Sequence, residues 1–209
     1  MACLLLAGCA SVGVPVALTE AERGGLGAFP ERPYGMEQSV VFTLRGRSFA
    51  GFGMTRVSPQ ERHFASSCLT AQGITVFELE ERGGRLEVLS TLPEMGDPAV
   101  VGEAFAGSIR AVYFDNLPPE DAAWSLEGGC WVAVSARPDG GSLLHRFGCA
   151  DGRLLEKRCL TRRGRVAWSV AFADYDGTGP RRMEVRDNTA RWPYTLAIRV
   201  RAWSRGGEE

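Results

Sequence analysis

The sequence predicts a mainly β (α+β) fold, in which a curved antiparallel sheet of about ten strands forms an incomplete β-barrel capped by one amphipathic helix. Three observations predict it. From about residue 38 onward, apolar and polar residues alternate with the period of a strand. Glycine-containing turns separate these segments at hairpin spacing. One stretch near the middle, from Pro98 to Phe114, has the period of a helix instead.

Five strands are expected before the helix. The first has apolar side chains at alternate positions from Val40 to Leu44. The second, over 48–57, contains Gly51 and Gly53, and glycine inside a strand favours bends or bulges. Such a strand suits a strongly curved sheet. Three more strands are expected over 63–70, 74–80 and 85–91.

The helix has a clear start. Asp97 is a favoured N-cap residue, and Pro98 is tolerated at the first helical position. Apolar side chains then recur at spacings of three and four, at Val101, Phe105, Ile109 and Val112. Gly102 and Ser108 keep the other side small or polar, and the helix should end near Phe114. An amphipathic helix of this kind must lie on an apolar surface.

Six strands are expected after the helix, over 130–136, 142–150, 153–161, 165–173, 182–186 and 193–203. Asp-Gly turns that separate several of them are strong hairpin signals. The fourth and the last of these strands alternate most cleanly. Their apolar faces carry Val166, Trp168, Val170, Phe172, Tyr194, Leu196, Ile198 and Val200. A curved sheet this wide is expected to roll into a barrel or half-barrel, with the helix on its concave side.

The N-terminus contains the segment Leu6-Ala7-Gly8-Cys9. It resembles the lipobox of bacterial lipoproteins, which has an aliphatic residue, two small residues and a cysteine. This resemblance implies that residues 1–8 are the remnant of a longer signal, that Cys9 is lipidated, and that residues 9–35 tether a single domain over 36–205. The competing interpretation is a short apolar N-terminal strand that happens to contain Gly-Cys.

The lipobox also implies a location outside the cytoplasm. Ala10 stands where many lipoproteins retained at the inner membrane have aspartate. The resemblance therefore implies a protein anchored to the outer membrane by its lipid and facing the periplasm. A lipidated cysteine with more than one acyl chain gives stable anchoring. Within the tether, Thr19 and Glu22 have the spacing of a capping box, which allows a short helix over 18–24.

Four cysteines remain for the folded domain, at Cys68, Cys130, Cys149 and Cys159. Four cysteines in an oxidising compartment can pair in three ways. If Asp139-Gly140 is a two-residue turn, Cys130 faces Cys149 across a hairpin, within the reach of a disulfide. If the turn is Gly140-Gly141 instead, that register is lost. Cys130 and Cys149 are therefore the disulfide candidates.

Charge and motifs argue against several classes of function. A net charge of −1 gives no electrostatic basis for nucleic-acid binding, and no run of about 20 apolar residues exists. His63 and His145 lack nearby metal ligands, and a Gly-x-Ser-x-Gly elbow is absent. The segment 174–179 weakly resembles a calcium loop but lacks EF-hand spacing, so a hairpin turn explains it better. We expect a monomer that is not an enzyme and has no metal or cofactor.

The order of these elements resembles the lipoprotein localisation carriers of Gram-negative bacteria, the LolA/LolB-like superfamily. Within it, the chain is most similar to an uncharacterised family of small lipoproteins. The resemblance covers about residues 38–203 and is strongest in the ending, Met183–Asn188 followed by Tyr194–Ile198. Proteins of this superfamily are incomplete antiparallel barrels whose helices cap an apolar cavity. The resemblance implies the same fold and a non-catalytic carrier.

On this resemblance, the protein should bind a lipid or an acylated protein in an apolar cavity, for lipid or lipoprotein transport or insertion in the envelope. The candidate lining residues are Val101, Phe105, Ile109, Val166, Trp168, Val170, Phe172, Leu196, Ile198 and Val200. Shielding an acyl chain gains about 0.8 kcal/mol per buried CH₂. The same side chains could instead form a dry core, and the protein would then be a non-catalytic accessory lipoprotein that scaffolds an envelope complex.

Overall fold

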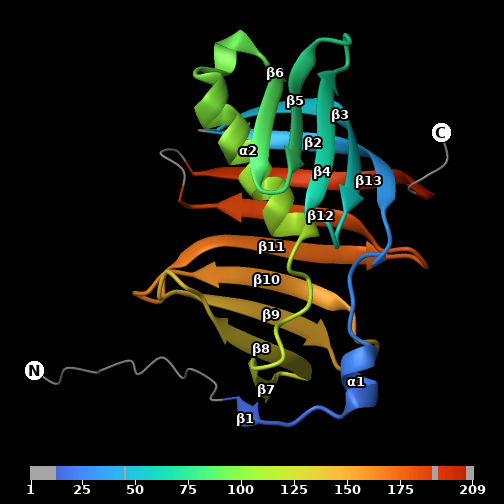
Figure 1. Ribbon diagram of the computed structural model, residues 1–209, viewed down its shortest axis with the longest axis vertical. Coiled ribbons are helices and arrows are strands. Elements are labelled where there is room, and N and C mark those ends of the chain that lie inside the picture. Colours follow the sequence, from blue (N-terminus) through green and yellow to red (C-terminus); the bar gives the residue numbers. More distant parts are fainter. Residues whose placement is uncertain (1–12, 45, 190–192, 206–209) are drawn as a thin grey trace, which may run out of the picture.

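The structure, a computed structural model, describes residues 13–44, 46–189 and 193–205. Within these ranges, 13 strands form one antiparallel sheet, in the order β1-β7-β8-β9-β10-β11-β12-β13-β2-β3-β4-β5-β6 (Figure 1). In chain order the elements are β1 (Val14–Pro15), α1 (Glu20–Gly24), β2 (Tyr34–Leu44), β3 (Arg47–Ser58), β4 (His63–Thr70), β5 (Thr75–Arg82), β6 (Arg85–Thr91), the 3-10 turn η1 (Pro93–Met95), α2 (Pro98–Tyr113), β7 (Ala123–Glu127), β8 (Cys130–Ala136), β9 (Ser142–Gly148), β10 (Leu154–Leu160), β11 (Val166–Tyr175), β12 (Pro180–Asp187) and β13 (Tyr194–Arg205).

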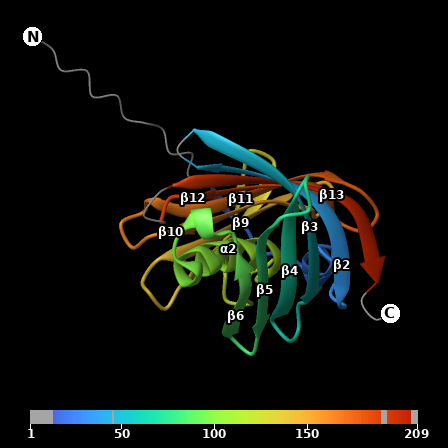
Figure 2. The ribbon, with the colours of Figure 1, turned by 90° about the horizontal axis from the view of Figure 1, so that it is seen from above.

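The sheet curls into an open half-barrel. Seen from above, β2 to β6 bend around one side of the molecule, β9 to β13 pass across it, and α2 lies in the concavity (Figure 2). The sheet does not close, because β1 and β6 are its two edges. The predicted fold class is confirmed, with 13 strands in place of about ten. The sequence pattern misses β1 and β7, which have two and five residues and are too short to show alternation.

One long-range pair joins the two halves of the chain. β2 and β13 pair along their whole length, from Tyr34 opposite Arg205 to Leu44 opposite Tyr194. The chain leaves the edge strand β6, crosses the mouth of the half-barrel as α2, and enters β7 near the opposite edge. The helix is therefore the connection between the two ends of the sheet as well as its cap.

The β8–β9 hairpin corrects the predicted register. Its loop has three residues, 138–140, and ends with Gly140 at a φ of 80°, a common hairpin geometry that requires the left-handed region. This loop places Cys130 opposite Gly148, one residue away from the predicted partner Cys149. The thiols of Cys130 and Cys149 are both free in the structure. The register argument for a disulfide with Cys149 is therefore wrong. The pairing itself stays a prediction, which peptide mapping without reduction would test.

Residues 13–33, which the sequence predicts as part of a tether, pack against the domain. β1 pairs with β7, and α1 begins with the capping box that Thr19 and Glu22 predict. The segment also contributes buried apolar side chains, at Leu18, Leu26 and Ala28. It is ordered along the sheet because these side chains find places in the core. Cys9 lies outside the described residues.

The core follows the concave face of the sheet. Its most completely buried apolar side chains come from both halves of the chain and include Phe64, Leu79, Phe147, Leu154, Val170 and Met183. Neither helix in the described ranges is long and apolar enough to cross a bilayer. A single apolar interior therefore holds the two limbs of the half-barrel together, and α2 packs into it.

Candidate functional site

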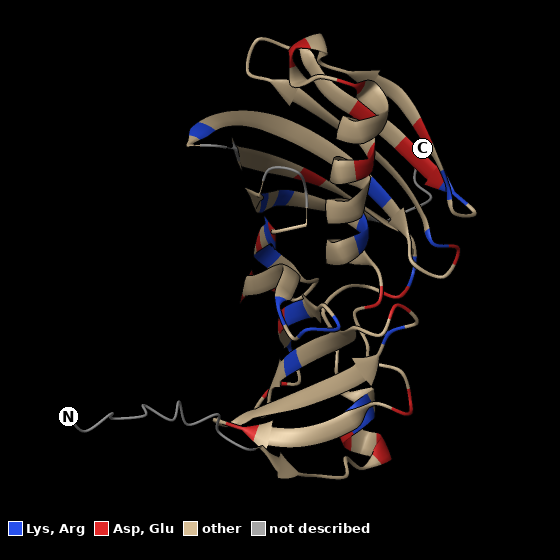
Figure 3. Ribbon diagram, turned by 90° about the vertical axis from the view of Figure 1, so that its left-hand side faces the viewer, with Lys and Arg blue, Asp and Glu red and all other residues tan. Residues whose placement is uncertain are grey.

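Helix α2 lies across the mouth of the half-barrel, as the sequence predicts. Asp97 caps its N-terminus by accepting a hydrogen bond from the Ala99 amide at 2.9 Å, and Pro98 follows in the first turn. Figure 3 looks onto this mouth, and the helix in front of it has only two charged residues, Glu103 and Arg110. A nearly uncharged helix in this place presents apolar surface both to the core and to the opening.

One face of α2 packs tightly on the limb formed by β2, β5 and β6. The ring of Phe105 stacks on Phe77 with centroids 4.4 Å apart and lies 5.5 Å from Phe42. Gly102 approaches β6 so closely that a Cβ built there would lie 2.4 Å from a methyl carbon of Val88. The helix can take this position because residue 102 has no side chain.

A groove remains on the other side of the helix, between α2 and the strands β11 and β12. Its volume is about 650 Å³ and its lining is mostly apolar. Small residues of α2 form one wall, and Trp168 of β11 and Val185 of β12 form the other. The complete lining is Ala99, Val100, Glu103, Ala104, Gly107, Ser108, Ala111, Trp168, Val185, Asp187 and Thr189. Val100, at its open end, is 67% exposed.

The space beneath α2 is filled. Its remaining cavity has a volume of about 20 Å³, which is room for about one water molecule. Phe105, Ile109, Leu196 and Ile198 line it together with polar side chains of Gln38, Ser66, Ser108 and Tyr113. The space beneath α2 in this conformation therefore has no room for a lipid, and the groove beside the helix is the larger of these two spaces.

The ten residues predicted to line a ligand cavity fall into three groups. Trp168 lines the groove, and Phe105, Ile109, Leu196 and Ile198 line the small cavity under α2. Val170, Phe172 and Val200 are buried in the core, and Val101 packs against it partly exposed. Val166 is 38% exposed at the start of β11. The structure thus brings only Trp168 to the groove, packs eight of the others in or against the core, and leaves Val166 partly exposed.

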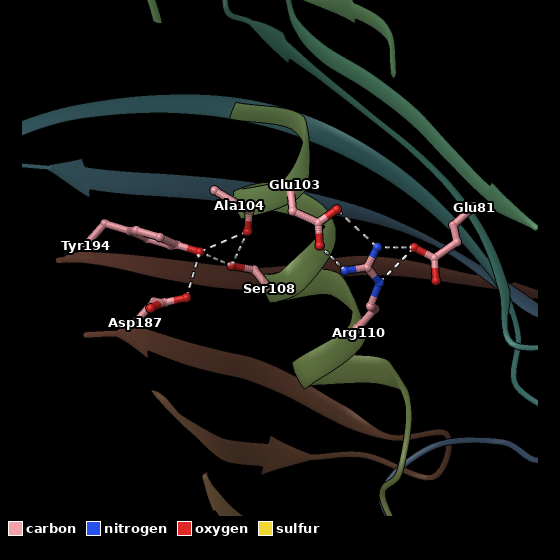
Figure 4. A network of polar contacts seen from close by, with 7 residues as sticks. All are labelled: Glu81, Glu103, Ala104, Ser108, Arg110, Asp187 and Tyr194. Carbon is pink, nitrogen blue, oxygen red and sulfur yellow. Dashed lines mark hydrogen bonds and ion pairs between the residues drawn. The ribbon is translucent and has the colours of Figure 1, made fainter. Parts of the chain in front are cut away.

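A hydrogen-bonded latch joins α2 to β13 at the floor of the groove. The Tyr194 hydroxyl lies 2.6 Å from Ser108 Oγ and donates to the Ala104 carbonyl oxygen at 3.0 Å, and Asp187 lies 3.5 Å away (Figure 4). Burial raises the pKa of Tyr194, so the hydroxyl stays protonated. Ser108 lines both the groove and the cavity beneath the helix. The latch therefore stands in the wall between the two.

An ion-pair network holds α2 to the other limb. The Arg110 guanidinium donates to Glu81 of β5 at 2.7 Å and to Glu103 of the same helix at 2.5 Å (Figure 4). Burial alone would lower the pKa of Arg110, but the two carboxylates outweigh it and raise that pKa. The Glu81 side chain is only 6% exposed, so removing Arg110 would leave a buried carboxylate without this partner.

A third set of contacts fixes the chain where it leaves α2. The Lys157 ammonium nitrogen of β10 lies 2.7 Å from the Phe114 carbonyl oxygen, and His145 of β9 lies 2.8 Å from the Asp115 carbonyl oxygen. Arg62 pairs with the Asp115 carboxylate at 2.6 Å. Burial lowers the pKa of Lys157 to about 7 and that of His145 to about 4. The segment that follows α2 is therefore held by polar contacts from β9, from β10 and from the turn between β3 and β4.

Sequence reasoning missed most of the groove. Of the two residues predicted on the small or polar side of α2, Ser108 lines the groove but Gly102 packs on β6, and no local pattern shows that β11 and β12 supply the opposite wall. The small side chains at Ala104, Gly107 and Ser108 were the available signal, because small residues on an amphipathic helix leave space beside it. Among the described residues, no group of three His, Cys, Asp or Glu side chains could hold a metal ion.

Comparison with protein-family models and with curated proteins finds no match to the sequence. Among solved structures, a LolA superfamily protein from Nitrosomonas europaea aligns with a TM-score of 0.58 at 11% identity, over 90% of this chain and 92% of that one. A DUF1329 family protein from Desulfovibrio piger aligns with a TM-score of 0.54 at 8% identity, over 90% of each chain. The open antiparallel sheet with α2 in its mouth is thus a fold that this chain shares with both proteins, one of them from the LolA superfamily, and it is the fold that the sequence resemblance implies.

Proposed function

We propose that this chain is a non-catalytic, lipid-anchored envelope protein that binds a lipid or an acylated protein in the groove between α2 and β11–β12. The observation that carries the proposal is the groove itself. Its volume of about 650 Å³ lies within the range of about 300–1,000 Å³ that is typical of ligand sites, and its lining is mostly apolar. The role we infer is transport or insertion of lipids or lipoproteins, by a monomer at the periplasmic face of the outer membrane.

The lining of the groove suits an acyl chain. Val100 and Trp168 offer apolar surface, and each buried CH₂ group of a ligand would gain about 0.8 kcal/mol. Charged side chains are confined to Glu103 and Asp187. The part of the ligand that fits this lining is therefore its hydrocarbon, with the polar headgroup left toward water.

Opening the latch would enlarge the site. Ser108 separates the groove from the small cavity under α2, so a shift of the helix away from Tyr194 would join the two. Phe105, Ile109, Leu196 and Ile198, which the sequence predicts as lining residues, would then reach the ligand. A long acyl chain would offset the loss of the latch through the apolar surface that it buries.

A second candidate function is an accessory lipoprotein that scaffolds an envelope complex. The filled interior favours it, since a cavity of about 20 Å³ has no room for an acyl chain. Native mass spectrometry of the protein purified from a periplasm, followed by lipid extraction, separates the two candidates. A lipid or acylated peptide bound at defined stoichiometry supports the carrier. A folded protein that stays free of ligand and takes up no added phospholipid or acylated peptide supports the scaffold.

Filling the groove should abolish loading without disturbing the fold. A Cβ at Gly107 would meet no atom within 4 Å, so Gly107→Leu adds a side chain that projects into open space. Leucine also has the higher helix propensity. We expect the fraction of protein that carries ligand to fall at least tenfold, as measured by native mass spectrometry. Ala171→Leu, which adds the same bulk on an exposed position of β11, is the matched control. Normal loading of Gly107→Leu would show that the groove is not the site.

Lipidation at Cys9 should be the means of membrane attachment. When the protein is expressed behind a complete signal, Cys9→Ser is expected to move it from the membrane fraction to the soluble fraction, because the thiol that would carry the acyl chains is gone. Immunoblots of the separated fractions and the intact mass of each form give the readout. A serine variant that remains with the membranes would contradict the lipid anchor.

A further inference from the structure

An apolar ladder runs along the concave face out of the core to the β1 edge of the sheet. Strand register places Val14 opposite Leu126, Leu126 opposite Trp131, Trp131 opposite Phe147, and Phe147 opposite Leu154. Leu154 and Phe147 are fully buried and Trp131 is partly buried. Leu126 is 41% exposed and Val14 is 64% exposed. The row of core side chains thus continues into solvent at this edge.

The packed N-terminal segment begins only a few residues after Cys9, the predicted lipidation site. The described chain begins at Gly13, only four residues after Cys9. A fully extended chain covers at most about 3.6 Å per residue, so these four residues span no more than about 14 Å. A tether of 27 residues, as the sequence suggests, would leave the domain free to turn. With a lipid on Cys9, a connection this short would hold the β1–β7 edge beside the membrane that the lipid enters.

We infer that the outer end of the ladder, called here the membrane rim and formed by the exposed Val14 and Leu126 with the partly buried Trp131, rests on the surface of the bilayer that holds the lipid of Cys9. This inference depends on the lipid anchor of the proposed function. Aliphatic side chains beside a tryptophan suit the boundary between acyl chains and headgroups, where amphipathic aromatic rings are enriched. Glu127 adjoins the rim, since a Cβ on Gly13 would lie 2.6 Å from it. A carboxylate at this place does not attract anionic headgroups. The contact with the bilayer is therefore made by the apolar side chains of the rim and needs no anionic lipid.

This placement orients the rest of the protein. In Figure 1, β1 and β7 lie at the end of the sheet opposite to β6 and the start of α2. The groove begins at β11, four strands from β7 in the order of the sheet. Neighbouring strands are about 4.8 Å apart, so the groove stands roughly 19 Å along the sheet from the membrane rim. A ligand in the groove would therefore lie above the membrane, outside the acyl-chain region.

Hydroxyl-radical footprinting of the full, lipidated chain on phosphatidylcholine vesicles tests the rim. The reference is the Cys9→Ser protein in solution. We expect oxidation of Leu126 and Trp131 to fall at least fivefold on vesicles. Met54 and Leu89, which are 58% and 52% exposed near the other edge of the sheet, should change less than twofold. Equal oxidation of Leu126 and Trp131 in the two states, or protection of Met54 and Leu89 instead, would overturn the inference.

A variant separates the rim from the anchor. Val14→Asp combined with Leu126→Asp, in the lipidated protein, should restore oxidation of Trp131 to within twofold of its value in solution, while Leu89→Asp should leave it protected. The intact mass reports lipidation independently. A protein that carries no lipid on Cys9 overturns the anchor and the rim together. A lipidated protein whose Trp131 stays as reactive as in solution overturns the rim alone.

Discussion

Lys157→Met is expected to stabilise the protein at pH 7 and to flatten the dependence of stability on pH between about 7 and 10. Lys157 is the only lysine of the chain, and its side chain is 1% exposed. Burial lowers its pKa to about 7 in the folded protein, whereas an unfolded lysine has a pKa of about 10.4. Asp115 acts against this change and Arg62 adds to it, both weakly beside burial.

The sign follows from proton binding. Between pH 7 and about 10.4, the unfolded chain binds a proton that the folded chain does not, so lowering the pH favours unfolding. The buried Lys157 amine therefore costs no folding stability above about pH 10.4, and its cost in stability is largest below pH 7. Because the pKa of Lys157 is about three pH units lower in the folded chain than in the unfolded chain, this cost in folding stability reaches about 4 kcal/mol. Methionine leaves the Phe114 carbonyl without this donor, which costs about 1–3 kcal/mol, so we expect a net gain of about 1–3 kcal/mol at pH 7.

Urea unfolding of both proteins at a series of pH values measures this effect. The stability of the wild type relative to the methionine variant should rise as the pH increases from 7 to 10, since the pKa of Cys68, which burial raises to about 11, affects both proteins alike. Lys157→Arg is the matched control, because guanidinium stays charged and should destabilise the fold at every pH. A difference between the two proteins that does not change over this range would show that the Lys157 amine titrates as it does in water.

Alanine substitutions at two glycines of α2 should have opposite effects. Gly107→Ala is expected to raise stability by about 0.5–1 kcal/mol, since alanine favours a helix and its methyl group meets nothing. Gly102→Ala is expected to lower stability by about 1–3 kcal/mol, because its methyl group would lie 2.4 Å from a stiff side chain of Val88. Either α2 or the edge strand β6 must then move.

The urea midpoints of the two alanine variants provide the test, because tryptophan fluorescence follows unfolding in both. Each variant serves as the control for the other, since the change of residue and the helix are the same. Stabilisation by both substitutions would mean that α2 does not press on β6. In that case the groove on the other side of the helix would be narrower than described.

The sequence alone determined the local elements. Asp97-Pro98 predicts the start of α2, and Thr19 with Glu22 predicts the capping box of α1, because the groups that form these hydrogen bonds are within four residues of each other. Alternation predicts the long strands for a similar reason, since the residues of one strand are enough to show which of its two sides is apolar. Together with the hairpin turns, these signals are enough for the fold class.

Tertiary structure decided where the apolar faces go. An apolar side chain on the concave face has no local property that says whether it meets another side chain or an opening, so Val170 is buried while Trp168, on the same face, lines the groove. Gly102 and Gly107 are alike in sequence, yet only the first touches β6. The pairings of β2 with β13 and of β1 with β7 are likewise set by distant parts of the chain. The functional groove therefore depends on how closely α2 packs on one limb, which is a property of the whole packed molecule.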